Sequence, residues 1–268
     1  MQAIMITSTG NTKVRRIAAY MEKSKARRED DVFIVEGIRM NAEIPQEKIL
    51  ETFVSESFLH KMQQSEKQYL MALANGYETV TDEVFRKMSD TQSPQGILSV
   101  VRQTHSDLVN ILDQDNPMLL LLEDVQDPGN LGTMFRSAEG AGVNGILMSR
   151  GTADVYNPKV VRSTMGAIFR MPFLYVDSIP ETMGQLRKKG ICTYAAHLQG
   201  KKSYDEMDYT KPCAFLIGNE GNGLSREAAE AADNYILIPM LGKVESMNAG
   251  TSAAILTFEA ARQRRTGH

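Results

Sequence analysis

Apolar positions in the second half of the chain fall into short, nearly continuous runs. Runs such as MLLLLEDV, GILMS and CAFLIG alternate with segments of helical apolar spacing. Near-continuous runs are typical of parallel strands that are covered on both faces. We therefore expect an open α/β fold with strands at 118–125, 145–149, 173–176, 191–196, 213–218 and 235–239, and helices at 131–141, about 157–169, 179–189, 225–232 and 247–264.

The first hundred residues have shorter elements. Helical spacing at 11–23, 38–44, 57–68 and 81–89 alternates with strand-like runs at 31–37, 49–56, 77–80 and 96–101. The polar stretch RQTHSDLVNILDQDN, with a weak helical tendency, separates the two patterns. We expect a smaller α/β domain at 1–101, a linker at 102–116 and a larger domain at 117–268.

Charge is distributed unevenly along the chain. The net charge is −3, yet residues 1–30 carry seven Lys and Arg against three Asp and Glu, a net of +4 that leaves −7 for the remainder. A uniformly basic nucleic-acid binder is therefore excluded. A local basic cluster can nevertheless contact phosphates, and an ordinary solvated helix face stays an open alternative.

Cysteine use and hydropathy indicate a cytoplasmic protein. The two cysteines, Cys192 and Cys213, lie in apolar strand-like contexts, so reduced core thiols are expected. No apolar run approaches the ~18 residues of a membrane helix, and the start MQAIMITSTGNTKVRR lacks the apolar stretch of a signal peptide. Because no run is long enough for a membrane helix, no membrane partner is expected. Metal-site spacing is also missing, so no metal is expected.

The first of three loops at strand ends is DVQDPGNLGTMFRSAEGAG. Pro128 and Gly129 shape a turn into a helix, and Asn130 is placed either to cap that helix or to act in a site. Arg136 opposes the helix dipole, which favours a role for its charge elsewhere, although simple surface exposure stays open. The loop has neither a dinucleotide fingerprint nor the lysine of a P-loop, which disfavours a generic nucleotide-binding enzyme.

The other two loops are LIGNEGNGLS and IPMLGKVESMNAG. Three glycines surround Glu220, the one ionisable side chain of the second loop, which is either solvated or hydrogen-bonded to neighbouring amides. In the third loop Ser246 is a candidate N-cap of the last helix, and Met247 is a candidate core residue. The sequence offers no nucleophile elbow and no histidine placed as a partnered base, which argues against a serine hydrolase.

With these motifs in order, residues 116–264 resemble the SpoU (TrmH-type) family of RNA ribose 2′-O-methyltransferases, within the SPOUT superfamily. The matching motifs are DPGNLGTMFRSAEGAG, YNPKVVRSTMGAIFRMP, GNEGNGL and IPMLGKVESMNAG. The first hundred residues look like the L30e-like substrate-binding domain that often precedes this catalytic domain. Met247 stands where leucine is more common, a near-isosteric replacement.

The resemblance implies a trefoil-knotted catalytic domain that binds S-adenosylmethionine, needs no metal and acts as a homodimer on RNA. Carried over by motif position, the active-site residues are Asn130, Arg136, Glu220, Ser246 and Asn248. The cofactor is expected to lie against backbone near Leu198, Gly218, Ile238 and Met247. The basic stretch 13–28, with Arg150, Lys159, Arg162 and Arg170, is expected to follow an RNA backbone.

The mechanism that we expect uses Arg136 as a donor to the target phosphate and 2′-oxygen, because guanidinium keeps its proton and is a poor base. Asn130 would hold Arg136 or the ribose, Ser246 and Asn248 would orient the nucleotide, and Glu220 would hold its own loop or Arg136. The expected substrate is large-subunit (23S) rRNA. Two alternatives stay open: the same reaction on tRNA, and an RNA-binding ribosome assembly factor that does not methylate.

Overall fold

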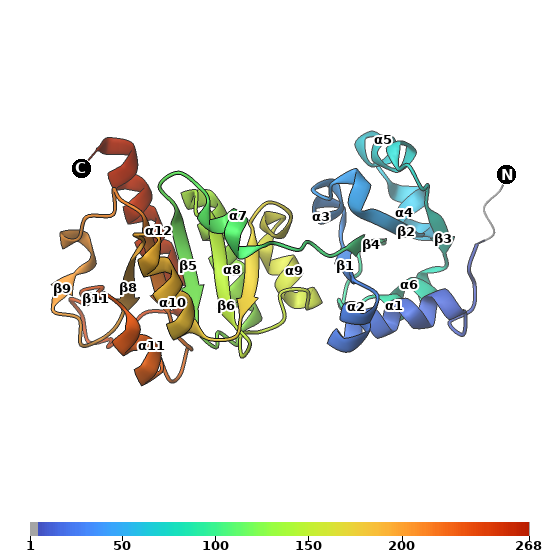
Figure 1. Ribbon diagram of the computed structural model, residues 1–268. Helices are drawn as coiled ribbons and strands as arrows, with labels where there is room; N and C mark the ends of the chain where they lie inside the picture. The colour runs from blue at the N-terminus through green and yellow to red at the C-terminus, as the bar shows by residue number, and fades with distance from the viewer. Residues whose placement is uncertain (1–4, 268) are drawn as a thin grey trace. The chain divides into compact units, whose positions relative to one another are not determined.

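The computed structural model describes residues 5–267, which divide into two compact units (Figure 1). The first unit takes in the chain as far as Thr104 together with Asp154–Phe169, and the second takes in His105–Ala153 with the chain from Arg170 onward. The segment Asp154–Phe169 thus belongs to the first unit, although its neighbours in sequence belong to the second.

The first unit is built on a small mixed sheet. Its strands are β1 (Val32–Glu36), β2 (Ile49–Ser55), β3 (Glu78–Val80) and β4 (Ile97–Arg102), in the order β1-β4-β2-β3. Strand β4 is antiparallel to both of its neighbours, and β2 and β3 are parallel. The helices of the unit are α1 (Thr12–Glu22), α2 (Ser24–Glu29), α3 (Ile38–Ala42), α4 (Glu56–Lys61), α5 (Gln64–Ala72), α6 (Asp82–Met88) and α9 (Pro158–Thr164).

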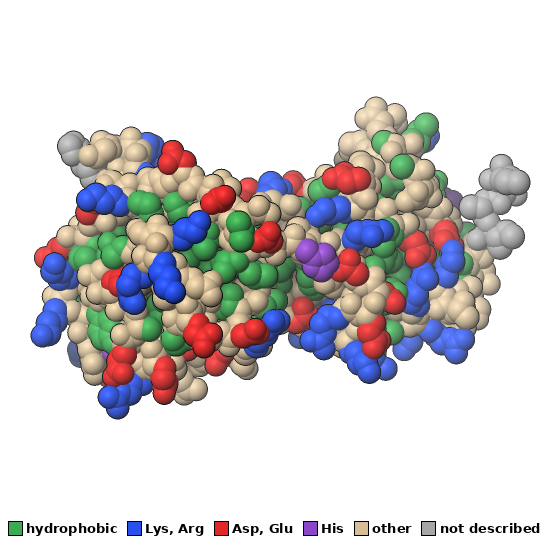
Figure 2. All heavy atoms as spheres, in the orientation of Figure 1, with side chains coloured by type: hydrophobic (Ala, Val, Ile, Leu, Met, Phe, Trp, Pro, Cys, Tyr) green, Lys and Arg blue, Asp and Glu red, His purple; other side chains and the backbone are tan. Residues whose placement is uncertain are grey.

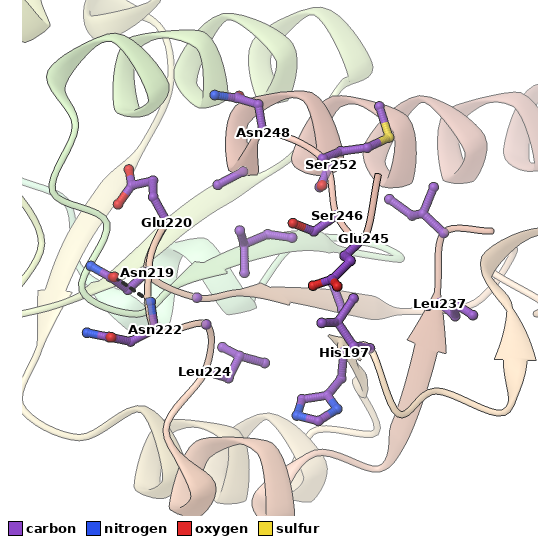
Figure 3. A pocket seen from close by; sticks show the side chains of 18 of the residues that line it. His197, Asn219, Glu220, Asn222, Leu224, Leu237, Glu245, Ser246, Asn248 and Ser252 are labelled. Atoms are coloured by element: carbon purple, nitrogen blue, oxygen red, sulfur yellow. Dashed lines mark hydrogen bonds between the residues drawn. The ribbon is translucent and has the colours of Figure 1, made fainter. Parts of the chain in front are cut away.

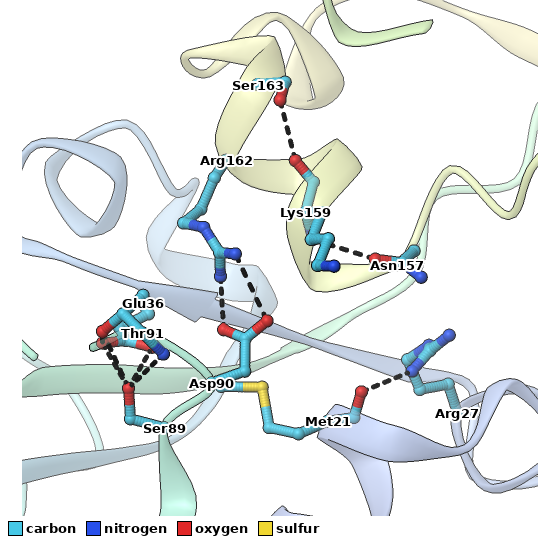
Figure 4. Close-up of polar contacts among 10 residues, drawn as sticks. All are labelled: Met21, Arg27, Glu36, Ser89, Asp90, Thr91, Asn157, Lys159, Arg162 and Ser163. Atoms are coloured by element: carbon cyan, nitrogen blue, oxygen red, sulfur yellow. Dashed lines mark hydrogen bonds and ion pairs between the residues drawn. The ribbon is translucent and has the colours of Figure 1, made fainter. Parts of the chain in front are cut away.

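Polar contacts join Asp154–Phe169 to the rest of the first unit (Figure 4). The buried Arg27 donates to the carboxylate of Asp154 at 2.6 Å, and Arg162 of α9 makes two hydrogen bonds to Asp90. The ring of Phe33 in β1 also lies 4.8 Å, centroid to centroid, from that of Tyr156. Because these partners are distant in sequence, the spacing of residues in the chain gives no sign of this grouping.

The second unit contains a parallel sheet that is buried on both faces. Seven strands of the described chain take the order β7-β6-β5-β10-β8-β11-β9. They are β5 (Met118–Leu122), β6 (Gly145–Ser149), β7 (Phe173–Val176), β8 (Cys192–Ala196), β9 (Lys202–Ser203), β10 (Cys213–Ile217) and β11 (Asn234–Leu237). All five residues of the central β5 are buried, as a strand covered on both sides requires.

Helices cover both faces of this sheet. Leu119 and Leu121 of β5 share one apolar cluster with α7 (Leu108–Leu112), α10 (Ile179–Lys188) and α11 (Arg226–Ala231). Helices α8 (Pro128–Ala141) and α12 (Ala249–Thr266) pack against each other and contact β6 and β10. The expected α/β class with a parallel sheet, preceded by a smaller α/β unit, is confirmed.

Most elements lie within three residues of their expected positions, and the differences have local causes. The single helix expected at 57–68 is two helices, α4 and α5, because Met62 is extended and a Gln63–Glu66 capping box begins α5. Helix α7 lies inside the stretch expected to be a linker. The two-residue strand β9 was not expected. No helix of the described part of the chain has the length and apolarity needed to cross a bilayer.

Candidate active site at the strand ends

One cavity of about 600 Å³ opens at the carboxyl ends of the parallel strands (Figure 3). Its lining comes from the segments directly after β8, β10 and β11, with contributions from α8 and α12. Ligands of open α/β sheets bind at this edge, and the volume falls in the range that holds drug-sized molecules.

The cavity brings together eight of the nine residues that the sequence singled out. They come from all three loops and from the end of β8, and they are Asn130, Leu198, Gly218, Glu220, Ile238, Ser246, Met247 and Asn248. The ninth, Arg136, does not line it. Segments more than a hundred residues apart in sequence thus share one site.

Glu220 links the second loop to the beginning of α8. Its carboxylate accepts hydrogen bonds from the backbone N–H groups of Gln126 and Asp127, at 3.2 and 3.1 Å, and from the side-chain amide of Asn130 at 3.0 Å. A carboxylate at a helix N-terminus is also favoured by the helix dipole. Glu220 therefore holds the first loop against the second, and in the described part of the chain it has no hydrogen bond or ion pair with Arg136.

These contacts determine the protonation state of Glu220. Partial burial raises the pKa of its carboxyl, but the hydrogen bonds from Asn130, Gln126 and Asp127 outweigh burial and hold the pKa below its ordinary value. The group is therefore an ionised acceptor at neutral pH. With three donors already bound, it is poorly suited to take a proton from a substrate.

Asn130 extends the network to the third loop. Its side-chain oxygen accepts a hydrogen bond of 2.7 Å from the amide of Asn248, while its amide donates to Glu220. Both ends of the Asn130 amide are thus engaged within the protein, rather than held toward Arg136. One carboxylate and two amides connect the three loops.

The helix caps differ from the expected ones. Asp127 is the N-cap of α8 and accepts from the backbone N–H of Asn130, so Asn130 is not the cap. Ser246 was the expected N-cap of α12, but the N-cap is Asn248, two residues later, which accepts a hydrogen bond from the backbone N–H of Thr251. Pro128 at the first helical position explains the early start of α8, because its ring presets the helical φ.

The glycine-rich loop is shaped by Asn219. Its side-chain oxygen accepts from the backbone N–H groups of Gly221 and Asn222, and its amide donates to the carbonyl of Asp124. A Cβ on Gly218 would lie 2.3 Å from the carbonyl carbon of Gly223. Only glycine allows this close turn of the backbone beside the cavity.

Arg136 is exposed on α8, and its side chain has no hydrogen bond or ion pair to any described residue. It follows Asn130 by six residues, which is about 9 Å along the helix and on a different face. The guanidinium therefore remains available to a ligand outside the cavity that its own chain forms.

The sequence reasoning missed two ionisable residues of the lining, His197 and Glu245. His197 follows directly after β8, which is the one signal that could have found it. Its Nδ1 accepts from the backbone N–H of Gln199, and its ring lies 5.0 Å from that of Tyr235. The imidazole is thus oriented by the protein itself.

The lining suits a cofactor with a flat base and polar arms. Ile217, Leu224 and Ile236 provide apolar walls, and Asn222 and Ser246 add polar groups. This mixture of apolar surface and a few polar groups is typical of small-molecule sites, and it fits the expected S-adenosylmethionine. No cluster of three or more His, Cys, Asp or Glu that could hold a metal occurs in residues 5–267.

Comparison with protein families gives matches to both parts of the chain. The model of the SpoU rRNA Methylase family matches residues 117–258, and that of the MRM3-like substrate binding domain matches residues 11–99. The chain is 33% identical over 179 residues to 23S rRNA (guanosine(2553)-2′-O)-methyltransferase RlmP of Bacillus subtilis, which covers 67% of this chain and 70% of the relative.

Solved structures are similar over nearly the whole chain. The rRNA methyltransferase from Sinorhizobium meliloti with bound AdoMet has a TM-score of 0.84 and 30% identity, covering 98% of this chain and 99% of that one. The SpoU methyltransferase AviRb from Streptomyces viridochromogenes, in complex with AdoMet, has a TM-score of 0.86 and 26% identity, covering 96% and 100%.

Proposed function

Because the chain belongs to the SpoU rRNA methylase family, we propose that it transfers a methyl group from S-adenosylmethionine to a ribose 2′-hydroxyl of 23S rRNA. The observation that carries the proposal is the network of Glu220, Asn130 and Asn248, which joins three loops around one cavity. The relative from Bacillus subtilis is named for this reaction on 23S rRNA.

In this proposal the cofactor is held by Leu198, Gly218 and Ile238, which follow β8, β10 and β11, and by Met247, which precedes α12; all four line the cavity. When bound, S-adenosylmethionine supplies a methyl group that its sulfonium makes electrophilic. The contribution of the protein is to hold the ribose 2′-oxygen in line with that group, and positioning of this kind can lower a barrier by about 7–11 kcal/mol.

Arg136 is proposed to contact the negatively charged groups of the substrate. Because Arg136 lies outside the cavity of its own chain, its guanidinium donates to the phosphate and 2′-oxygen of a nucleotide at the cavity of the second copy in the proposed homodimer, stabilising the negative charge that grows on that oxygen. Asn130 acts as a positioning residue, because the protein occupies both ends of its amide. Asn248 is likewise a positioning residue, because its amide donates to Asn130 and accepts from Thr251, and Ser246 orients the nucleotide.

The active form is proposed to be a homodimer. Exposed apolar side chains on the second unit support this: Leu241 is fully exposed, Val244 is 62% exposed and Phe258 of α12 is 51% exposed. Burying such side chains against a second copy is favourable. Sedimentation at working concentration should give twice the mass of one chain, and a monomer that is active at saturating substrate would contradict this part of the proposal.

The N-terminal domain at 1–101 is proposed to recognise RNA, with 102–116 as connector and 117–268 as the catalytic domain. The match of residues 11–99 to a substrate-binding domain supports this division. We propose a cytoplasmic location, because the relative from Bacillus subtilis is named for a reaction on 23S rRNA.

The test is transfer of labelled methyl by the purified chain to unmodified 23S rRNA and, separately, to tRNA. We expect label in 23S rRNA that survives alkaline hydrolysis as a protected dinucleotide, because a 2′-O-methyl group blocks cleavage. Label in tRNA alone would support the tRNA alternative. Binding of RNA without any transfer would support the assembly factor.

A further inference from the structure

Ion pairing divides the basic residues of the first unit into two sets. The cations that have acidic partners are Lys13 with Glu78, Arg16 with Glu51, Lys25 with Glu29 and the buried Arg27 with Asp154. By contrast, several exposed cations of the unit have no side-chain hydrogen bond or ion pair to any residue between 5 and 267, and Arg15, Lys23 and Lys87 are among them.

Other cations expected to follow RNA are also neutralised within the protein. Arg150 pairs with Asp177 at 2.9 Å, and Arg162 pairs with Asp90. A cation that already has a carboxylate partner gains less from a phosphate, because the existing pair must first be broken. A phosphate is therefore expected to bind more favourably to the unpaired cations than to the paired ones.

Three of the unpaired cations, Arg15, Lys23 and Lys87, line one groove. A hollow of about 180 Å³ between α1 and α6 is lined by Arg15, Ala18, Ala19 and Lys23 from the α1 side and by Lys87 from α6. Arg15, Ala18 and Ala19 share one face of α1, since residues three and four apart are neighbours on a helix. The two alanines leave room for a ligand to approach the helix closely.

The charge and length of the groove suit an extended anion. Glu22 is the one carboxylate of its lining, so three cations leave a local excess of two positive charges. Arg15 and Lys23 are eight residues apart, or about 12 Å along the helix. That span exceeds a single phosphate. Figure 2 shows basic side chains gathered along the edge of the unit where α1 and α2 lie.

We infer that the groove between α1 and α6 is a contact site for the RNA phosphate backbone, with Arg15, Lys23 and Lys87 as its donors. The inference rests on the proposed function and adds to it where the substrate-binding part of the chain touches RNA. Contacts of this kind position the RNA and carry no base specificity, so the groove contributes to affinity and leaves the chemical step unchanged.

The test compares two full-length triple variants that remove equal charge. The groove variant is R15A/K23A/K87A, and the control is K13A/R16A/K25A, whose cations are paired. Binding to unmodified 23S rRNA is measured over a series of KCl concentrations. We expect the groove variant to bind about tenfold more weakly or worse, with a salt slope reduced by about 2–3, since each of the three lost phosphate contacts removes roughly 0.7–0.9 from the slope. The control should change affinity less than about threefold.

Measuring methyl transfer by the same variants distinguishes failure of this inference from failure of the proposed function. The groove variant should raise the KM for RNA and keep kcat, and its affinity for S-adenosylmethionine should match that of the parent chain. Unchanged RNA affinity and salt slope, or equal losses in both variants, would overturn the inference while a methylating parent chain still supports the function. A parent chain that does not methylate RNA would refute the function itself.

Discussion

Glu220 shows how much of the site depends on one side chain. It was singled out as the ionisable residue of its loop, but its role could not be derived, because its partner Asn130 lies 90 residues away in sequence. The structure gives it three donors from the first loop. Removing an acceptor from such a set leaves N–H groups without a partner, which costs more than the hydrogen bonds add.

We therefore expect Glu220→Gln to lower the free energy of unfolding at neutral pH by about 1 kcal/mol, because an amide nitrogen would face the N–H groups of Gln126 and Asp127. Denaturation in urea measures this loss. The matched control is Glu245→Gln, since Glu245 lines the same cavity without a side-chain hydrogen bond to the described residues. Equal stability of the two variants would contradict the role given to Glu220.

The same substitution changes the pH dependence of stability. In the folded chain the pKa of Glu220 lies below its ordinary value of 4.5. Its contribution to stability is therefore complete above that ordinary value and is lost as the pH falls through the lower folded-state pKa. Urea midpoints followed from neutral pH into this acid range should fall less steeply in Glu220→Gln than in the parent chain. Parallel curves would refute this assignment.

Arg136 tests the proposed chemistry. Arg136→Ala should reduce kcat by about 10²–10³, the usual cost of losing a donor to a developing negative charge, and leave the affinity for S-adenosylmethionine nearly unchanged. Arg136→Lys keeps the charge but loses the planar fork of donors, so it should restore little of the rate. Arg265→Ala, on α12, is the control. A large loss of cofactor affinity in Arg136→Ala would contradict the proposal that Arg136 contacts RNA and not the cofactor.

At the scale of elements, the sequence was informative wherever one local signal was strong. The strand GILMS at 145–149 and the strand FLYV at 173–176 have the bounds that their apolar runs predicted, since a short apolar run between turn residues marks the length of such a strand directly. Strand β9 was missed because two residues that pair only with β11 make no such run. The caps of α8 and α12 depended on competition between neighbouring polar residues.

The glycine-rich loop after β10 allows a steric prediction. Gly218→Ala places a Cβ 2.3 Å from backbone of Gly223, so the loop must shift, at about 1–3 kcal/mol. A lower Tm and weaker binding of S-adenosylmethionine should follow, measured by thermal unfolding and calorimetry. In Gly221→Ala the added carbon would lie 3.6 Å from its nearest neighbour, so the Tm should fall far less. Equal shifts in Tm would show that the close turn is unimportant.

At the scale of the molecule, the sequence motifs identified the class of fold and the three loops, but not which segments group together. Asp154–Phe169 joins the first unit through partners up to 127 residues away. No periodicity within a segment carries such information. Likewise, the division of cations into paired and unpaired sets required the structure, because the composition of residues 1–30 counts them all alike.

The most direct measurement for the whole account is a map of 2′-O-methyl groups in 23S rRNA from cells with and without the gene. We predict that one ribose methylation is missing without the gene, returns with the intact chain and stays missing with Arg136→Ala. Identical maps in the presence and absence of the gene, with purified protein that labels neither naked 23S rRNA nor ribosomal particles, would contradict the proposal that this chain is a 23S rRNA methyltransferase.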